Sequence, residues 1–230
     1  MNRNRQIILA IFVLALAALA CNAVAGGGGG GTDDPTGPTS TPSPRVIFSD
    51  DFSSSQWGTG TDADSSVEYA NNALQMIVYT TNYFVWSTPN DQVYQNTHME
   101  VTVNNNGTDS TTAFGIMCNQ QPTTSNFYYV AMTPAGEYAI AKAVEGQEDL
   151  FLTNNDQWAS SDLIATDASS YKVGMDCGNG AITLYVDGQQ IASVADASYV
   201  DGGVALFTWS GEDATTTDVS FDDFLMTELP

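Results

Sequence analysis

Apolar and polar residues alternate with a period of two along most of the chain beyond Arg45, which is the pattern of half-buried β-strands. The clearest example is residues 171–194, where three short alternating runs are joined by two turns that contain glycine. Asp187 and Gly188 form the second turn, and this pair is typical of a β-hairpin because a type I′ turn needs positive φ at both central residues. The stretch therefore predicts a three-stranded antiparallel meander that serves as scaffold. Its apolar residues share one face, which we expect to be buried: Tyr171, Val173, Met175, Cys177, Ile182, Leu184 and Val186.

Strand-like runs recur at short intervals from residue 46 to the end of the chain, and turn residues separate them. No helical pattern is visible beyond a short turn at 162–167, and no repeat of the length used by propellers and solenoids is present. These features predict an all-β fold, a two-sheet antiparallel β-sandwich or jelly roll. The expected strands are 46–52, 67–70, 73–79, 83–87, 98–104, 112–119, 127–133, 137–143, 150–152, 170–177, 181–186, 189–194, 203–209 and 218–227.

The start of the chain has the composition of an export signal. Arg3 and Arg5 precede an unbroken apolar run at 7–20, which is shorter than the roughly 20 residues a membrane-spanning helix needs. The run ends in small residues followed by Cys21, and this ending resembles the bacterial lipoprotein signal, in which the cysteine is lipidated and becomes the new N-terminus. Ordinary signal cleavage, which would leave Cys21 unmodified, is the alternative. We expect a signal peptide at 1–20.

Residues 21–44 have the composition of a tether. Six consecutive glycines are followed by a segment rich in Pro, Thr and Ser, and no apolar periodicity is present from which a core could form. A coil of this length reaches about 25–30 Å. A tether placed directly after a lipidated cysteine predicts a folded domain at 45–230 that is held at the outer face of a bacterial membrane, with the membrane as anchor only.

The charge of the chain is strongly negative. Five Lys and Arg residues stand against 27 Asp and Glu residues, which gives a formal net charge of −22. Such a chain repels nucleic acid and anionic lipid headgroups, so nucleic-acid partners are excluded. The acidity fits a soluble extracytoplasmic domain, and it also fits one that binds divalent cations.

Several short motifs resemble the concanavalin A-like lectin/glucanase superfamily and, more narrowly, the family named 3-keto-disaccharide hydrolases. The motifs are Phe-Ser-Asp-Asp-Phe at 48–52, Phe-Tyr-Tyr at 127–129, Gly-Glu-Tyr at 136–138, Leu-Tyr-Val-Asp-Gly at 184–188 and Val-Ser-Phe-Asp-Asp-Phe at 219–224. The resemblance implies a jelly roll and a carbohydrate ligand or substrate. In that fold the first and last strands lie side by side, which implies that the acidic pairs of the first and last motifs are close together.

Cys118 and Cys177 each lie on the apolar face of an expected strand, in a chain that we expect to enter an oxidising compartment. With Cys21 lipidated, these two remain as a pair. The sequence favours a disulfide between them, and two free buried thiols that pack as small apolar groups are the alternative.

No catalytic residue is predicted. His98 is the only histidine and has no serine elbow to act with, so we expect an ordinary surface histidine. Glycosidases of the superfamily carry closely spaced acids in the pattern Glu-x-Asp-x-x-Glu, and the chain has no such run.

Two acidic pairs are candidates for a metal site. Asp50 and Asp51 end the first expected strand, and Asp222 and Asp223 lie in the last. Carboxylate oxygens gathered at one strand junction could hold a structural Ca²⁺, which takes hard oxygen ligands. The alternative is that these side chains cap strand ends or bond to neighbouring backbone amides.

Aromatic residues are abundant, and an exposed aromatic ring can stack on a sugar ring while nearby amides and carboxylates bond to its hydroxyl groups. Trp57 and Trp158 lie in expected loops, and Tyr128 or its neighbour Tyr129 must face away from the core because adjacent strand residues point to opposite faces. We therefore expect Trp57, Trp158 and Tyr128 to contact carbohydrate, whereas most aromatic residues of a sandwich belong to its core.

These observations predict a membrane-anchored lipoprotein whose jelly-roll domain binds a polysaccharide or a cell-envelope glycan. Two alternatives remain open: a glycoside-cleaving enzyme like the family that it resembles, and a non-catalytic structural or assembly protein of the cell surface.

Overall fold

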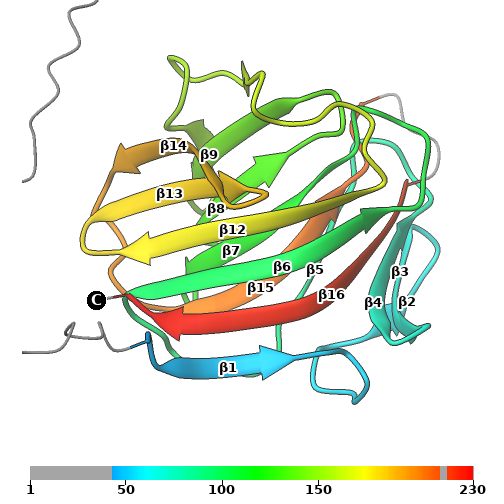
Figure 1. The fold of residues 1–230 in the computed structure, drawn as a ribbon, viewed down its shortest axis with the longest axis horizontal. Coiled ribbons are helices and arrows are strands. Elements are labelled where there is room, and N and C mark those ends of the chain that lie inside the picture. The colour runs from blue at the N-terminus through cyan, green and yellow to red at the C-terminus, as the bar shows by residue number, and fades with distance from the viewer. Residues whose placement is uncertain (1–42, 213–216, 230) are drawn as a thin grey trace, which may run out of the picture. The chain divides into compact units, whose positions relative to one another are not determined.

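The computed structural model describes residues 43–212 and 217–229, which form two antiparallel β-sheets packed face to face (Figure 1). This arrangement confirms the predicted β-sandwich. The described residues contain no helix long and apolar enough to cross a membrane. The predicted signal peptide at 1–20, Cys21 and most of the predicted tether lie outside the described residues.

The nine-stranded sheet faces the viewer in Figure 1 and contains the first and last strands of the domain. β1 (Val46–Asp50) pairs with β16 (Thr217–Glu228), with Asp50 opposite Phe224, so the neighbourhood implied by the resemblance is present. The remaining strands follow in the order β14 (Gln189–Ala195), β13 (Ala181–Val186), β12 (Ser170–Gly178), β6 (Thr97–Asn105), β16, β4 (Ala73–Val78), β3 (Ser65–Ala70) and β2 (Gly60–Thr61).

The seven-stranded sheet lies behind it in Figure 1. Two short strands, β2 in the first sheet and β11 in this one, were not predicted, because a strand of two residues shows no period. The order is β10 (Leu150–Phe151), β9 (Glu137–Ala143), β8 (Phe127–Met132), β7 (Ala113–Gln120), β15 (Gly203–Trp209) and β5 (Phe84–Ser87), with β11 (Ala159–Ser160) also paired to β9.

The predicted meander is confirmed as β12, β13 and β14, which pair in sequence order. Asp187 and Gly188 have φ of 51° and 77°, as a type I′ turn requires. The apolar face of the meander is buried as expected.

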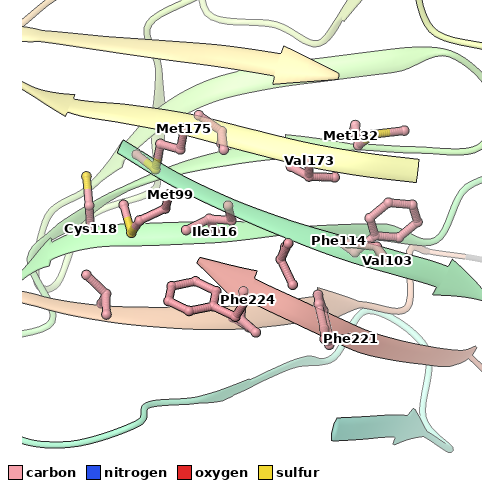
Figure 2. Packing of buried hydrophobic residues seen from close by; sticks show 14 of the residues in the cluster. Met99, Val103, Phe114, Ile116, Cys118, Met132, Val173, Met175, Phe221 and Phe224 are labelled. Atoms are coloured by element: carbon pink, nitrogen blue, oxygen red, sulfur yellow. The ribbon is translucent and has the colours of Figure 1, made fainter. Parts of the chain in front are cut away.

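The core lies between the sheets and is built from the inward-facing residues of both (Figure 2). Met99 and Met175 of the nine-stranded sheet point toward Ile116 of the seven-stranded sheet in this view, and all three are buried. The predicted disulfide between Cys118 and Cys177 is formed. It joins β7 to β12, so a covalent bond links the two sheets.

Candidate functional site

The outer face of the seven-stranded sheet is apolar, although it is turned away from the core. On β8, Val130 belongs to the core between the sheets, whereas Tyr129 and Ala131 point outward. On β15, Leu206 belongs to the core, whereas Phe207 points outward. An antiparallel sheet that faces solvent normally alternates apolar with polar residues. These strands are apolar on both faces, so their outer face needs a separate explanation.

The outward residues line an open cavity of about 370 Å³, which we call the aromatic basin. Its lining is mostly aromatic and comes from four strands of the sheet and from the segments around β10 and β11. It consists of Asn82, Phe84, Ala113, Phe127, Tyr129, Ala131, Asp149, Phe151, Trp158, Phe207 and Trp209.

The rings at the floor of the basin pack against each other. Phe207 stacks on Phe84 with ring centroids 4.8 Å apart, and Tyr129 meets Phe207 edge-on at 5.6 Å. Gly115 of β7 makes this packing feasible, because a Cβ at this position would lie 3.1 Å from the Phe207 ring and only 1.8 Å from the carbonyl oxygen of Val130. The glycine therefore permits an aromatic floor where a larger residue would displace it.

One wall of the basin is a loop whose conformation is stabilised by hydrogen bonds within it. Phe151 and Trp158 lie on it with ring centroids 6.0 Å apart. Asp156 accepts a hydrogen bond from the Phe151 backbone N–H at 2.8 Å, and the Asn154 amide donates to the Trp158 carbonyl at 2.6 Å. Asn154, Asn155 and Asp156 all have positive φ, a conformation that Asn and Asp tolerate better than most residues. The loop thereby keeps Trp158 partly exposed beside the sheet.

Two polar pairs border the basin. The Tyr129 hydroxyl donates to Asp149 at 2.9 Å, and the Trp209 indole N–H donates to Asn82 at 3.2 Å. Burial of Tyr129, reinforced by the negative charge of Asp149, raises the pKa of the hydroxyl far above its ordinary value, so Tyr129 remains a donor. Asp149 is therefore held in place in the lining of the basin. It is the one carboxylate in the lining.

Trp158 lies in the aromatic basin, but the prediction that Trp57 is exposed was wrong. Only 4% of Trp57 is exposed, and its ring packs edge-on to Phe224 with centroids 5.2 Å apart. Its indole N–H donates to buried Asp50 at 3.1 Å. The loop turns inward because Asp50 supplies the acceptor that a buried tryptophan requires.

Tyr128, which we expected to contact carbohydrate, does not line the aromatic basin. Its ring is 1% exposed and points into the core, and its hydroxyl bonds to Asp196 and to the backbone N–H groups of Ser198 and Tyr199. The adjacent residue, Tyr129, faces the basin instead. Alternation along β8 allowed either tyrosine to face the core, and the structure places Tyr128 inside and Tyr129 outside.

The four aspartates of the calcium hypothesis are neighbours, but they do not converge. Both oxygens of Asp50 are engaged, one by the Phe52 backbone N–H at 2.8 Å and the other by Trp57. Asp51 accepts from Ser53, and Asp222 accepts from the Asp223 backbone N–H. Within the described residues no three His, Cys, Asp or Glu side chains are grouped so that they could hold a metal ion. The calcium hypothesis gains no support from this placement.

His98 lies on the outer face of the nine-stranded sheet in a polar network. Its Nδ1 is 2.6 Å from Asp176, and Asp176 also accepts from the Tyr185 hydroxyl at 2.7 Å. Glu100 lies 3.6 Å from the other ring nitrogen and pairs with Lys172 at 3.2 Å. The hydrogen bond to Asp176 raises the pKa of His98, although burial opposes the charge. His98 therefore lies at the outer surface of the sheet, as predicted, and it has two carboxylate neighbours that were not predicted.

The sheet order and the pairing of the first and last strands are those of a two-sheet jelly-roll sandwich, a fold that similar solved structures share. A carbohydrate binding module from Bacillus subtilis superposes with a TM-score of 0.59 at 11% identity, covering 75% of this chain and 96% of its own. A Bacillus licheniformis β-glucanase gives 0.55 at 12% identity, covering 80% and 98%. The catalytic domain of an endo-1,3-β-glucanase from Thermotoga petrophila gives 0.56 at 11% identity, covering 82% and 99%.

At these identities the likeness shows the fold, which carbohydrate-binding and glycan-cleaving domains share. No protein-family model matches the chain, and no curated protein matches it in sequence.

Sequence reasoning missed most of the aromatic basin, including Phe84, Phe207 and Trp209. A signal was present: aromatic residues two positions apart occur on three strands, at 84 and 86, 127 and 129, and 207 and 209. Two such residues on one strand share a face. Asp149 carries no signal of its own, because it reaches the basin only through the path of the loop.

Proposed function

We propose that the domain binds carbohydrate in the aromatic basin without cleaving it, and that the chain is an exported lipoprotein anchored through Cys21. The observation that carries the binding proposal is the packed set of aromatic rings on an outer sheet face, with Trp158 partly exposed above it. Apolar C–H faces of a sugar ring pack on such rings, and Asp149 and Asn82 stand at the rim to bond hydroxyl groups. Ligand sites of this kind combine an apolar lining with few fixed polar groups.

The lining favours binding over cleavage. Glycoside hydrolysis normally uses two carboxyl groups on opposite sides of the scissile bond. Asp149 is the one carboxylate that lines the basin, and it is tied to Tyr129. Hydrolysis of a glycan that stops on replacing Asp149 would reverse this ranking.

The binding proposal is tested with the full chain in detergent and a panel of polysaccharides, by isothermal titration. We expect a neutral glycan to bind, and we expect Trp158→Ala to weaken binding by about tenfold or more, the loss of a contact of about 1.4 kcal/mol. Tyr185→Ala, on the outer face of the nine-stranded sheet, is the matched control and should bind as the unmodified chain does. A panel without any binder, or equal losses in both variants, would favour the structural or assembly role.

The anchoring proposal rests on Cys21, the export-type residues before it and the tether after it. The disulfide between Cys118 and Cys177 supports an oxidising, extracytoplasmic location. Expressed in a bacterium, the chain should fractionate with membranes and carry a lipid mass on Cys21. Cys21→Ala should appear in the soluble fraction, and an unchanged distribution would refute the anchor.

A further inference from the structure

A second depression lies on the same outer sheet face, beside the aromatic basin. It has a volume of about 410 Å³, and we call it the Trp86 shelf. One aromatic ring and several amide side chains dominate its lining. The lining consists of Trp86, Thr88, Asn90, Asp91, Gln92, Val93, Gln120, Gln121, Pro122 and Gly203.

The shelf and the basin are joined through β5. Phe84 lines the basin and Trp86 lines the shelf; they are two residues apart on one strand, so both point to the outer face. Their ring centroids are 6.0 Å apart. Trp86 is also directly opposite Phe207, the central ring of the basin floor, on the neighbouring strand. The rings therefore form one continuous row across two depressions.

Trp86 is the most exposed ring of this row. Half of its surface is accessible, at 50%, whereas Phe207 is 1% exposed. Exposing a large aromatic ring to water costs free energy, and a ligand or partner that covers the ring would recover it. Beside it, the Gln120 side chain lies over Gly203, with Oε1 3.6 Å from where a Cβ would be. An exposed ring flanked by amides is suited to a sugar, whose ring faces are apolar and whose edges carry hydroxyl groups.

The charges around both depressions argue against an anionic ligand. The described cationic side chains are Arg45, Lys142 and Lys172, and each is paired with a carboxylate: Glu228, Asp196 and Glu100, respectively. No Lys or Arg lines the basin or the shelf, whereas Asp149 and Asp91 do. With a chain charge of −22, a uronate or sulfate group would be repelled at this face.

We propose that the basin and the Trp86 shelf are adjacent subsites for one uncharged polysaccharide chain, bound along its length. This inference rests on the proposed function, and it adds the ligand class and a second subsite. The basin holds one part of the chain against Phe207 and Trp158. The Trp86 ring and the amides of Gln120 and Gln92 hold the next part.

The test compares short and long oligosaccharides of the neutral polysaccharide that the panel identifies as a binder, by titration of the full chain. The unmodified chain should bind long oligosaccharides about tenfold or more tightly than short ones. Trp86→Ala should remove this gain and leave the affinity for the shortest ligand unchanged, whereas Trp158→Ala should weaken both. Tyr79→Ala is the matched control, because Tyr79 is similarly exposed, at 46%, but directly follows β4 of the other sheet.

The outcomes separate the two proposals. If Trp158→Ala weakens binding and Trp86→Ala changes no affinity, the second subsite is refuted while the proposed function stands. If no polysaccharide of the panel binds, both are refuted. Equal binding of a sulfated polysaccharide such as κ-carrageenan would refute the neutral class. If Trp86→Ala leaves glycan binding intact but converts a dimer into a monomer on size-exclusion chromatography, Trp86 serves a second copy of the chain instead.

Discussion

The two sheets are alike on their inner faces and differ on their outer faces. Both contribute buried apolar residues to one core, as Met175 and Ile116 illustrate. Outside, the nine-stranded sheet carries the charged network around His98, whereas the seven-stranded sheet carries the aromatic basin. The outer face of the nine-stranded sheet is therefore hydrated and forms its own ion pairs. The outer face of the seven-stranded sheet consists of rings packed against each other, with room for a ligand in the aromatic basin.

The contrast teaches where function is to be sought in a sandwich. Alternation of apolar and polar residues explains the nine-stranded sheet without any ligand. In the seven-stranded sheet the outward residues depart from that alternation: Tyr129, Ala131 and Phe207 form a second apolar cluster outside the core, and the core between the sheets does not account for it.

Loss of the disulfide tests what the sheets share. The double variant Cys118→Ala, Cys177→Ala should lose about 4 kcal/mol of stability, because the bond closes a loop with a sequence separation of 59 residues. Denaturant unfolding of the chain with and without reductant measures the effect. Glycan binding by the folded variant should persist; its disappearance would show that the basin depends on the link between the sheets.

Truncation on each outer face tests the difference directly. Phe207→Ala should cost about 3 kcal/mol, because the ring is buried and stacked on Phe84 as a core residue would be. Tyr185→Ala, on the other outer face, should cost about 1 kcal/mol, since it removes mainly a partly exposed hydrogen bond. Equal losses in urea titrations would mean that the two faces are not energetically distinct.

Each outer face also has one tyrosine that donates to an aspartate, which permits a finer test. Tyr129→Phe should cost about 1–2 kcal/mol, because the hydroxyl and its bond to Asp149 are largely buried. Tyr185→Phe should cost less than about 1 kcal/mol, although burial and then the bond to Asp176 raise the pKa of Tyr185 to about 12. Spectrophotometric titration should show Tyr185 ionising before Tyr129, and the reverse order would contradict the assignment.

The smallest effect is a pH dependence confined to the nine-stranded sheet. The bond to Asp176 raises the pKa of His98, so its contribution is complete below the unfolded pKa of about 6.5 and is lost as pH rises through the folded pKa. Burial opposes ionisation of Asp176, but its bonds from His98 and Tyr185 outweigh this and lower its pKa. The contribution of Asp176 is therefore present above about pH 3.9 and is lost as pH falls.

The stability difference between the unmodified chain and His98→Asn should be at most about 1 kcal/mol near pH 5.5 and should shrink toward pH 9. Glu100 and Lys172 also face this network, so Glu100→Gln should reduce the same difference. Urea unfolding over the pH series measures it. A difference that does not vary with pH would show that His98 contributes no charge-dependent stability.

Much of the fold was predictable because its causes are local. Strand periodicity placed the long strands within a few residues, and the Asp187–Gly188 turn fixed the register of a hairpin. The pairing of Cys118 with Cys177 was predicted because both lie on apolar faces of expected strands and because Cys21 was assigned to lipid. Of the three strands of two residues, β10 was predicted within the apolar run 150–152, whereas β2 and β11 escaped detection because they contain no large apolar residue and show no period.

The candidate site was predictable only in part, because alternation assigns residues to faces without saying which face is the inner one. Trp158 was identified from its loop, yet Trp57 had the same loop character and is buried against Asp50. The sequence pattern did not say which of Tyr128 and Tyr129 faces the core. In the structure the inner Tyr128 hydroxyl bonds to Asp196, and the outer Tyr129 hydroxyl bonds to Asp149.

The sequence by itself determined that this chain forms a two-sheet sandwich with a linked pair of cysteines, since period, turn residues and apolar content act over short distances. Only the tertiary structure decided that rings from β5, β8, β15 and a distant loop meet on one outer face. The physical reason is that strand order is set by packing of the whole core. No local pattern states that β15 lies between β5 and β7, and the aromatic basin exists because it does.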